Sequence, residues 1–119
     1  MLVQVRYSSN SKIGIFINNG SGSFLPKVEY SAGVTPLRIK VIDLDNDGYL
    51  DLIVSSSAIL LCKVNIYFGK NDGTYNLPLA LAISSQANVI LAKDIDADGA
   101  TDLVIPDNNA KTDVYLNKN

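Results

Sequence analysis

A nine-residue acidic motif occurs twice in this chain. It reads DLDNDGYLD at residues 43–51 and DIDADGATD at residues 94–102. Both copies place aspartates at positions one, three, five and nine, and a glycine at position six. Carboxylates crowded into one short loop repel each other unless a cation lies between them. The duplicated spacing therefore predicts a cation site in each copy and a repeated fold around them.

Shifting the sequence by 51 residues aligns far more than the acidic motif. KIGIFI at 12–17 falls on KVNIYF at 63–68, and GSGSF at 20–24 falls on NDGTY at 71–75. The same shift places residues 1–3 on residues 52–54. A period near 50 is typical of β-propeller blades. We interpret the chain as one repeat domain, 1–119, with units at 1–51, 52–102 and, in part, 103–119.

The segments between the turns have the pattern of strands. Ile13, Ile15 and Ile17 recur at every second position, which indicates a half-buried strand. Residues 52–54 and 103–105 are apolar throughout, which predicts strands covered on both faces. The expected strands are 2–8, 12–18, 24–31, 37–43, 51–57, 62–69, 76–84, 88–94, 102–106 and 112–117. The predicted fold class is all-β, with about two and a half four-stranded antiparallel propeller blades.

Composition excludes several classes of protein and site. The net charge is −2 and the sequence has no run of basic residues, so nucleic-acid binding is not expected. Histidine is absent and Cys62 is the single cysteine, which excludes an intrachain disulfide, a Cys/His zinc cluster and a Ser-His-Asp triad. No apolar run reaches the roughly 18 residues of a membrane span, and residues 1–6 do not resemble a signal peptide.

The EF-hand is the first calcium loop to compare with the acidic motif. Its aspartates at one, three and five and its glycine at six match. An EF-hand also needs a bidentate carboxylate at position twelve and flanking helices. Position twelve is Val54 in the first copy and Ile105 in the second, and both lie in expected strands. The EF-hand interpretation is therefore rejected.

A terminal aspartate at position nine, followed at once by an apolar strand, resembles the calcium loop of the FG-GAP/VCBS repeat family of integrin-type β-propellers. The segment IYFGKNDGTY at 66–75 is similar to the strand and turn that follow in that family. The resemblance implies that each loop joins the first two strands of a blade and binds Ca²⁺, about two ions per chain. The implied ligands are Asp43, Asp45, Asp47, Asp51 and the Tyr49 carbonyl, and then Asp94, Asp96, Asp98, Asp102 and the Ala100 carbonyl.

The sequence also gives each loop position a physical role. Gly48 and Gly99 permit a positive φ where the chain reverses, and the aspartate at position nine ties the loop to the next strand. The alternative is a pair of solvated turns without an ion, because Asp-Gly turns are common. Two complete copies favour the metal site over this alternative.

Two and a half blades do not close a ring. The terminal units are expected to supply strands two to four and one to three of their blades, so an open arc exposes an apolar sheet face. Either the chain is a piece of a longer propeller, or several copies associate. We expect a homo-oligomer that completes the ring.

The expected function is a calcium-stabilised scaffold or a recognition module for a protein or glycan. The alternative is a calcium-dependent lectin that binds one sugar per blade. An enzyme acting through paired aspartates is a third possibility, but the aspartates are better explained as metal ligands, so no catalytic activity is expected. Because exposed loops of this kind fill at millimolar calcium, the expected location is extracellular or at the cell surface.

Overall fold

The computed structural model describes residues 2–6, 11–57 and 61–118, and it is all-β in these ranges. Ten strands lie close to the ten expected from the sequence. They are β1 (Leu2–Arg6), β2 (Lys12–Phe16), β3 (Val28–Ser31), β4 (Pro36–Ile42), β5 (Asp51–Ser57), β6 (Cys62–Tyr67), β7 (Leu79–Ile83), β8 (Leu91–Lys93), β9 (Asp102–Pro106) and β10 (Thr112–Tyr115). The described residues contain no helix with the length and hydropathy of a membrane span.

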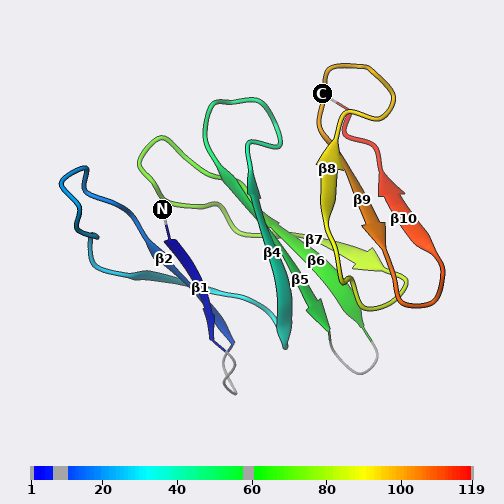
Figure 1. Ribbon diagram of the computed structural model, residues 1–119, viewed down its shortest axis with the longest axis horizontal. Coiled ribbons are helices and arrows are strands. Elements are labelled where there is room, and N and C mark those ends of the chain that lie inside the picture. The colour runs from blue at the N-terminus through cyan, green and yellow to red at the C-terminus, as the bar shows by residue number, and fades with distance from the viewer. Residues whose placement is uncertain (1, 7–10, 58–60, 119) are drawn as a thin grey trace.

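The strands form three antiparallel sheets placed one after another along an arc (Figure 1). The N-terminal sheet has the order β1-β2-β3, the middle sheet β4-β5-β6-β7, and the C-terminal sheet β8-β9-β10. None of the three is closed on itself. The terminal sheets correspond to strands two to four and one to three of a four-stranded unit, as the sequence predicted.

The middle sheet is covered on both faces, because residues of β5 alternate between two cores. Leu52 and Val54 join Ile13 and Ile15 of the N-terminal sheet in one core. Ile53, on the opposite face, packs in a second core with residues of the C-terminal sheet. All three residues of 52–54 are fully buried, which confirms the prediction made from their unbroken apolar run.

The C-terminal sheet is covered on one face only within the described structure. Leu103 and Ile105 are buried against the middle sheet, whereas Val104 between them is half-buried. The expectation that residues 103–105 are covered on both sides is therefore wrong for this chain alone. The physical reason is that no further sheet of the described chain lies beyond it.

The pairing of β1 differs from the alignment of residues 1–3 with 52–54. Leu2 lies opposite Phe16, whereas Ile53, its counterpart by the 51-residue shift, lies opposite Ile66, the counterpart of Ile15. A slip of one residue exchanges the two faces of a strand. The observed pairing sets Val3 and Val5 opposite Ile15 and Ile13, so the apolar residues of the two strands match.

Candidate metal centre

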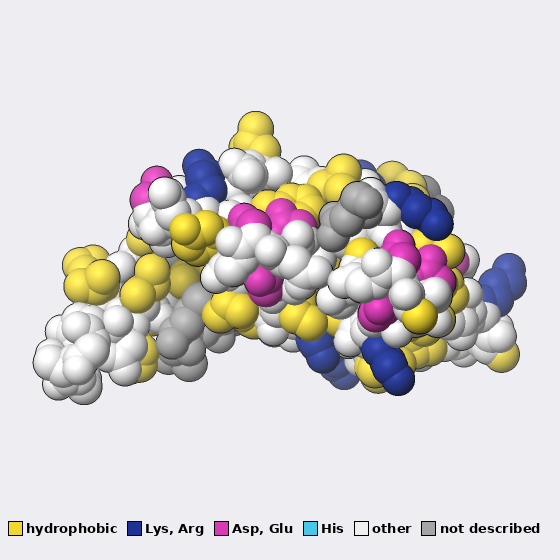
Figure 2. Space-filling model, turned by 90° about the horizontal axis from the view of Figure 1, so that it is seen from above, with side chains coloured by type: hydrophobic (Ala, Val, Ile, Leu, Met, Phe, Trp, Pro, Cys, Tyr) yellow, Lys and Arg dark blue, Asp and Glu magenta, His cyan; other side chains and the backbone are white. Residues whose placement is uncertain are grey.

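Both acidic motifs form loops at the same end of neighbouring sheets (Figure 1). Loop 1 (residues 43–51) joins β4 to β5, and loop 2 (residues 94–102) joins β8 to β9. Seen from that end, acidic side chains gather in two neighbouring groups (Figure 2). The fold therefore places the two loops side by side, although 51 residues separate them in the chain.

Loop 1 brings three of its carboxylates together. Oxygen atoms of Asp43, Asp45 and Asp51 all lie within 4.8 Å of one another, and we call this group triad 1. Asp51 is fully buried at the start of β5. Its carboxylate accepts hydrogen bonds from the N–H groups of Leu44 and Gly69, both 2.8 Å long. Asp51 therefore ties loop 1 to β5, as its place at position nine predicted, and it also joins the loop to Gly69, just after β6.

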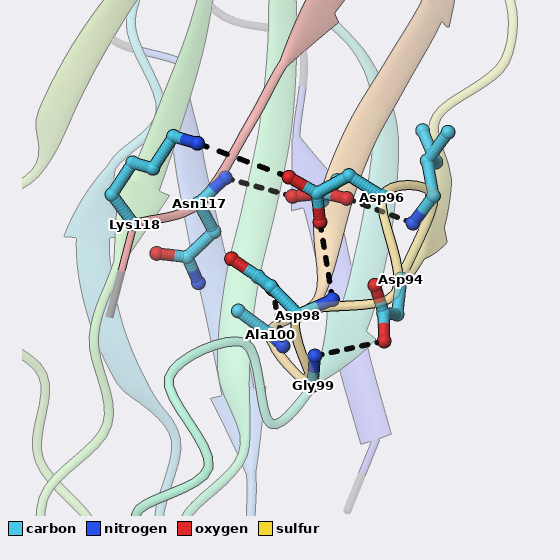
Figure 3. A network of polar contacts seen from close by, with 9 residues as sticks. Asp94, Asp96, Asp98, Gly99, Ala100, Asn117 and Lys118 are labelled. Atoms are coloured by element: carbon cyan, nitrogen blue, oxygen red, sulfur yellow. Dashed lines mark hydrogen bonds and ion pairs between the residues drawn. The ribbon is translucent and has the colours of Figure 1, made fainter.

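Loop 2 repeats this arrangement (Figure 3). Oxygen atoms of Asp94, Asp96 and Asp102 lie within 4.8 Å of one another and form triad 2. The buried Asp102 accepts from the N–H groups of Ile95 and Asn117, again at 2.8 Å. Lys118 reaches toward this group, with its Nζ 3.8 Å from Asp96 Oδ2.

The backbone turns in the same way in both loops. Gly48 and Gly99 have φ angles of 91° and 90°, which confirms the conformation predicted for position six. Their N–H groups donate to Asp43 and Asp94 across 2.9 Å in each case. These bonds aim the first aspartate of each loop at the centre of the turn.

The donor set fits a hard divalent cation. Two oxygens bound to one Ca²⁺ lie no more than about 5 Å apart, because each Ca–O distance is roughly 2.3–2.6 Å. The oxygens of each triad lie within 4.8 Å of one another and so meet this limit. Asp94 Oδ1 is buried and accepts no hydrogen bond from any described residue. A buried carboxylate oxygen in that state is stabilised by a cation.

The two buried aspartates differ in the direction of their pKa shifts. Burial raises the pKa of Asp51, assisted by the neighbouring charges of Asp45 and Asp47 and opposed by the N–H donors of Gly69 and Leu44. The N–H donors of Ile95 and Asn117 instead lower the pKa of Asp102. Asp51 lies in the sheet that is covered on both faces, so its carboxylate is more strongly desolvated.

Two predicted carboxylates lie outside the triads. Asp47 and Asp98 at position five accept hydrogen bonds from the N–H groups of Tyr49 and Ala100 instead, both 2.8 Å long. The carbonyls of Tyr49 and Ala100 are the backbone ligands that the resemblance implied. Their role as ligands stays a prediction, whereas positions one, three and nine of each loop are brought together.

Sequence reasoning missed two features of the centre. Position four has a positive φ in both loops, 60° at Asn46 and 62° at Ala97. Of these two residue types, asparagine adopts that conformation more readily. The N–H groups of Gly69 and Asn117, which hold Asp51 and Asp102, also come from outside the motif. The signal for Asn117 is its place directly after Val114-Tyr115-Leu116, which corresponds to the place of Gly69 after Ile66-Tyr67-Phe68 once the three-residue shorter third connection is allowed for.

Comparison with known proteins supports the repeat assignment. The family model of the FG-GAP-like repeat matches residues 2–54, a range that contains β1 to β4, loop 1 and the start of β5. No curated protein and no solved structure gave a match to this chain. The resemblance inferred from the acidic motif is thus confirmed over residues 2–54, which match the FG-GAP-like repeat.

Proposed function

We propose that this chain is a calcium-binding β-propeller repeat module, in which each ion fastens an acidic loop to the following strands of its blade. The observation that supports it most directly is the pair of matching triads, each ending in a fully buried aspartate. Such an aspartate joins the loop, a strand start and a neighbouring strand end. An ion at that point stabilises the folded hairpin by mass action.

The role that follows is a structural scaffold or a recognition module for a protein or a glycan. No catalytic role is proposed, because the acidic groups of the two loops are accounted for as ligands and loop supports. Exposed loops such as these, at the ends of the middle and C-terminal sheets, bind calcium with modest affinity. We therefore place the protein outside the cell or on its surface, where millimolar calcium fills them.

Calorimetric titration of chelator-treated protein with CaCl₂ tests the proposal. We expect two sites per chain and a melting temperature that rises with calcium. At a free calcium concentration 100 times its Kd, each site should add about 2.7 kcal/mol to the free energy of unfolding. Asp45→Asn and Asp96→Asn should each remove one site. Asp72→Asn, an exposed aspartate outside both loops, is the control. Absence of binding heat together with an unchanged melting temperature would contradict the proposal.

Association of copies is the second part of the proposal. Leu91, Val104 and Val114 lie side by side across β8, β9 and β10, and Leu91 and Val114 are about half exposed. The corresponding pair in the middle sheet, Ile53 and Ile66, is buried against the C-terminal sheet. A second copy that covers this row repeats an interface already present within the chain.

The number of sheets favours two copies. Three sheets per chain give six in a dimer, which lies within the 4–8 blades of known propellers, whereas three copies give nine. Light scattering should show twice the 12.8 kDa chain mass. Val114→Glu should shift the mass to that of a monomer, and Val89→Glu, an exposed valine outside the row, should not. A monomeric parent protein would exclude the dimer.

A calcium-dependent lectin is the alternative function, and one cavity favours it. A groove of about 540 Å³ lies between the middle and C-terminal sheets and opens beside loop 1. Phe68 and Tyr115 give it aromatic walls, and Asp45, Asn76 and Asn117 give it polar ones. Such a mixture suits a sugar ring. Glycan-array binding that disappears with chelator would support this function, and no binding at all would leave the scaffold.

A further inference from the structure

The two acidic loops touch each other directly. The side-chain amide of Asn46 in loop 1 donates a hydrogen bond to the Gly99 carbonyl of loop 2, with 3.3 Å between Nδ2 and the oxygen. The N–H of Gly99 in turn donates to Asp94 Oδ2 at 2.9 Å. Gly99 therefore connects a side chain of loop 1 with the first carboxylate of triad 2.

Asn117 forms a second connection between the same loops. Its backbone N–H donates to Asp102 Oδ1 in triad 2 at 2.8 Å. Its side-chain Nδ2 donates to the Leu44 carbonyl of loop 1 at 3.1 Å. The N–H of Leu44 donates to Asp51 Oδ2 in triad 1 at 2.8 Å. A continuous series of three hydrogen bonds thus links the buried aspartate of one triad to that of the other.

We propose that Asn46 and Asn117 are positioning residues that couple the two cation sites, so that filling one site strengthens binding at the other. An ion that orders one loop also fixes the carbonyl or donor on which the neighbouring loop depends. The neighbouring triad then needs less ordering when its own ion binds. Because linkage is reciprocal, each ion raises the affinity for the other by the same factor. This inference rests on the proposed calcium-binding function.

The chain supplies well-matched variants to test the coupling. Asn46→Ala removes the contact to Gly99, and Ala97 shows that alanine already occupies this left-handed position in loop 2. Asn117→Ala removes the contact to Leu44 while it keeps the N–H that holds Asp102. Asn109→Ala is the control, since Asn109 lies in the exposed β9–β10 turn at the opposite end of β9.

The experiment is calorimetric titration of the full chain with CaCl₂, together with titrations of the single-site variants Asp96→Asn and Asp45→Asn. In the parent chain, we expect the affinity of each site to be about fivefold or more higher when the other is filled. Asp96→Asn should weaken site 1 by that factor, and Asp45→Asn should weaken site 2 equally. The double variant Asn46→Ala/Asn117→Ala should bind two ions with the coupling lost, whereas Asn109→Ala should retain it.

Amide hydrogen exchange gives a readout independent of the binding heats. In Asp96→Asn, where only site 1 fills, calcium should slow amide exchange at Gly99 in loop 2 and at Asn117, which follows β10. If filling one site changes neither the calcium affinity nor the amide exchange of the other, the coupling is overturned and calcium binding is left intact. Absence of any binding would overturn the proposed function itself, so the two failures are distinguishable.

Discussion

The hydroxyl of Tyr67 in the middle sheet donates a hydrogen bond to the carbonyl of Ser31, the last residue of β3 in the N-terminal sheet. The same contact recurs between the next two sheets, where the Tyr115 hydroxyl donates to the Ala82 carbonyl. The two acceptors are 51 residues apart, as the sequence period requires. A tyrosine at this position therefore fastens each sheet to the one before it, and Phe16 occupies the same place in the N-terminal sheet without a hydroxyl.

Replacement of this hydroxyl should weaken the contact between sheets. Tyr67→Phe keeps the ring in its core and removes only the donor, so we expect a loss of about 1 kcal/mol in the free energy of unfolding. Urea unfolding in chelator should show a lower midpoint with an unchanged slope. Tyr49→Phe, at an exposed tyrosine, is the control. Equal midpoints for the two variants would contradict the assigned role of Tyr67.

Gly69 should tolerate no side chain, because loop 1 approaches it closely. A Cβ at this position would lie 2.5 Å from the Leu50 carbonyl oxygen. Both groups belong to backbone segments fixed by Asp51, so we expect Gly69→Ala to cost more than about 2 kcal/mol and to weaken calcium binding at site 1. Gly20→Ala meets no nearby atom and tests the cost of positive φ alone, about 1 kcal/mol. A smaller loss for Gly69→Ala than for Gly20→Ala would refute this explanation.

Replacement of Ala97 should be able to stabilise the fold, because alanine is strained at the φ of 62° that this position adopts. Asparagine adopts this conformation more readily and already does so at Asn46, the matching position of loop 1. We expect Ala97→Asn to raise the free energy of unfolding by about 0.5–1 kcal/mol, and Ala97→Val to lower it. Thermal unfolding in chelator checks both changes. A stability ranking that follows side-chain size alone would count against backbone strain as the cause.

Glu29 should make folding stability dependent on acid. The Nζ atoms of Lys12 and Lys27 lie 2.8 and 2.5 Å from its carboxylate, and they lower its pKa from 4.5 to about 2. Because the folded-state pKa is depressed, the contribution is complete above pH 4.5 and is lost as the pH falls through about 2. The stability difference between the parent chain and Glu29→Gln should shrink over this range.

Salt gives an independent check on Glu29, since its carboxylate is exposed to solvent. Added NaCl should reduce the difference in unfolding free energy between the parent chain and Glu29→Gln at neutral pH, because screening weakens exposed ion pairs. A difference that stays constant across pH and salt would show that Glu29 acts through packing and not through charge.

Most of the fold follows from periodic features of the chain. The 51-residue repeat, the alternation around Ile13 and Ile15 and the turn formers between segments predicted ten strands, all of which are present. The apolar run 52–54 predicted a strand covered on two faces, and Ile53 packs on one side while Leu52 and Val54 pack on the other. Local pattern was sufficient here because side-chain alternation in a strand has a fixed period of two.

The sequence did not predict the register of β1. The observed register places Val3 opposite Ile15 and Val5 opposite Ile13. The choice depends on the faces of two strands together, which a comparison of one segment with its repeat cannot show.

The sequence by itself determined the acidic loops, their glycines at positive φ and the all-β repeat, because these depend on residue spacing within a few positions. Only the tertiary structure decided which carboxylates meet and which outside groups support them. Asp51 and Asp102 are buried by strands brought from elsewhere in the chain, and Gly69 and Asn117 supply their N–H donors from 18 and 15 residues away. The contact of Asn117 with Leu44, across 73 residues, has no local signal, since it exists only because two sheets pack side by side.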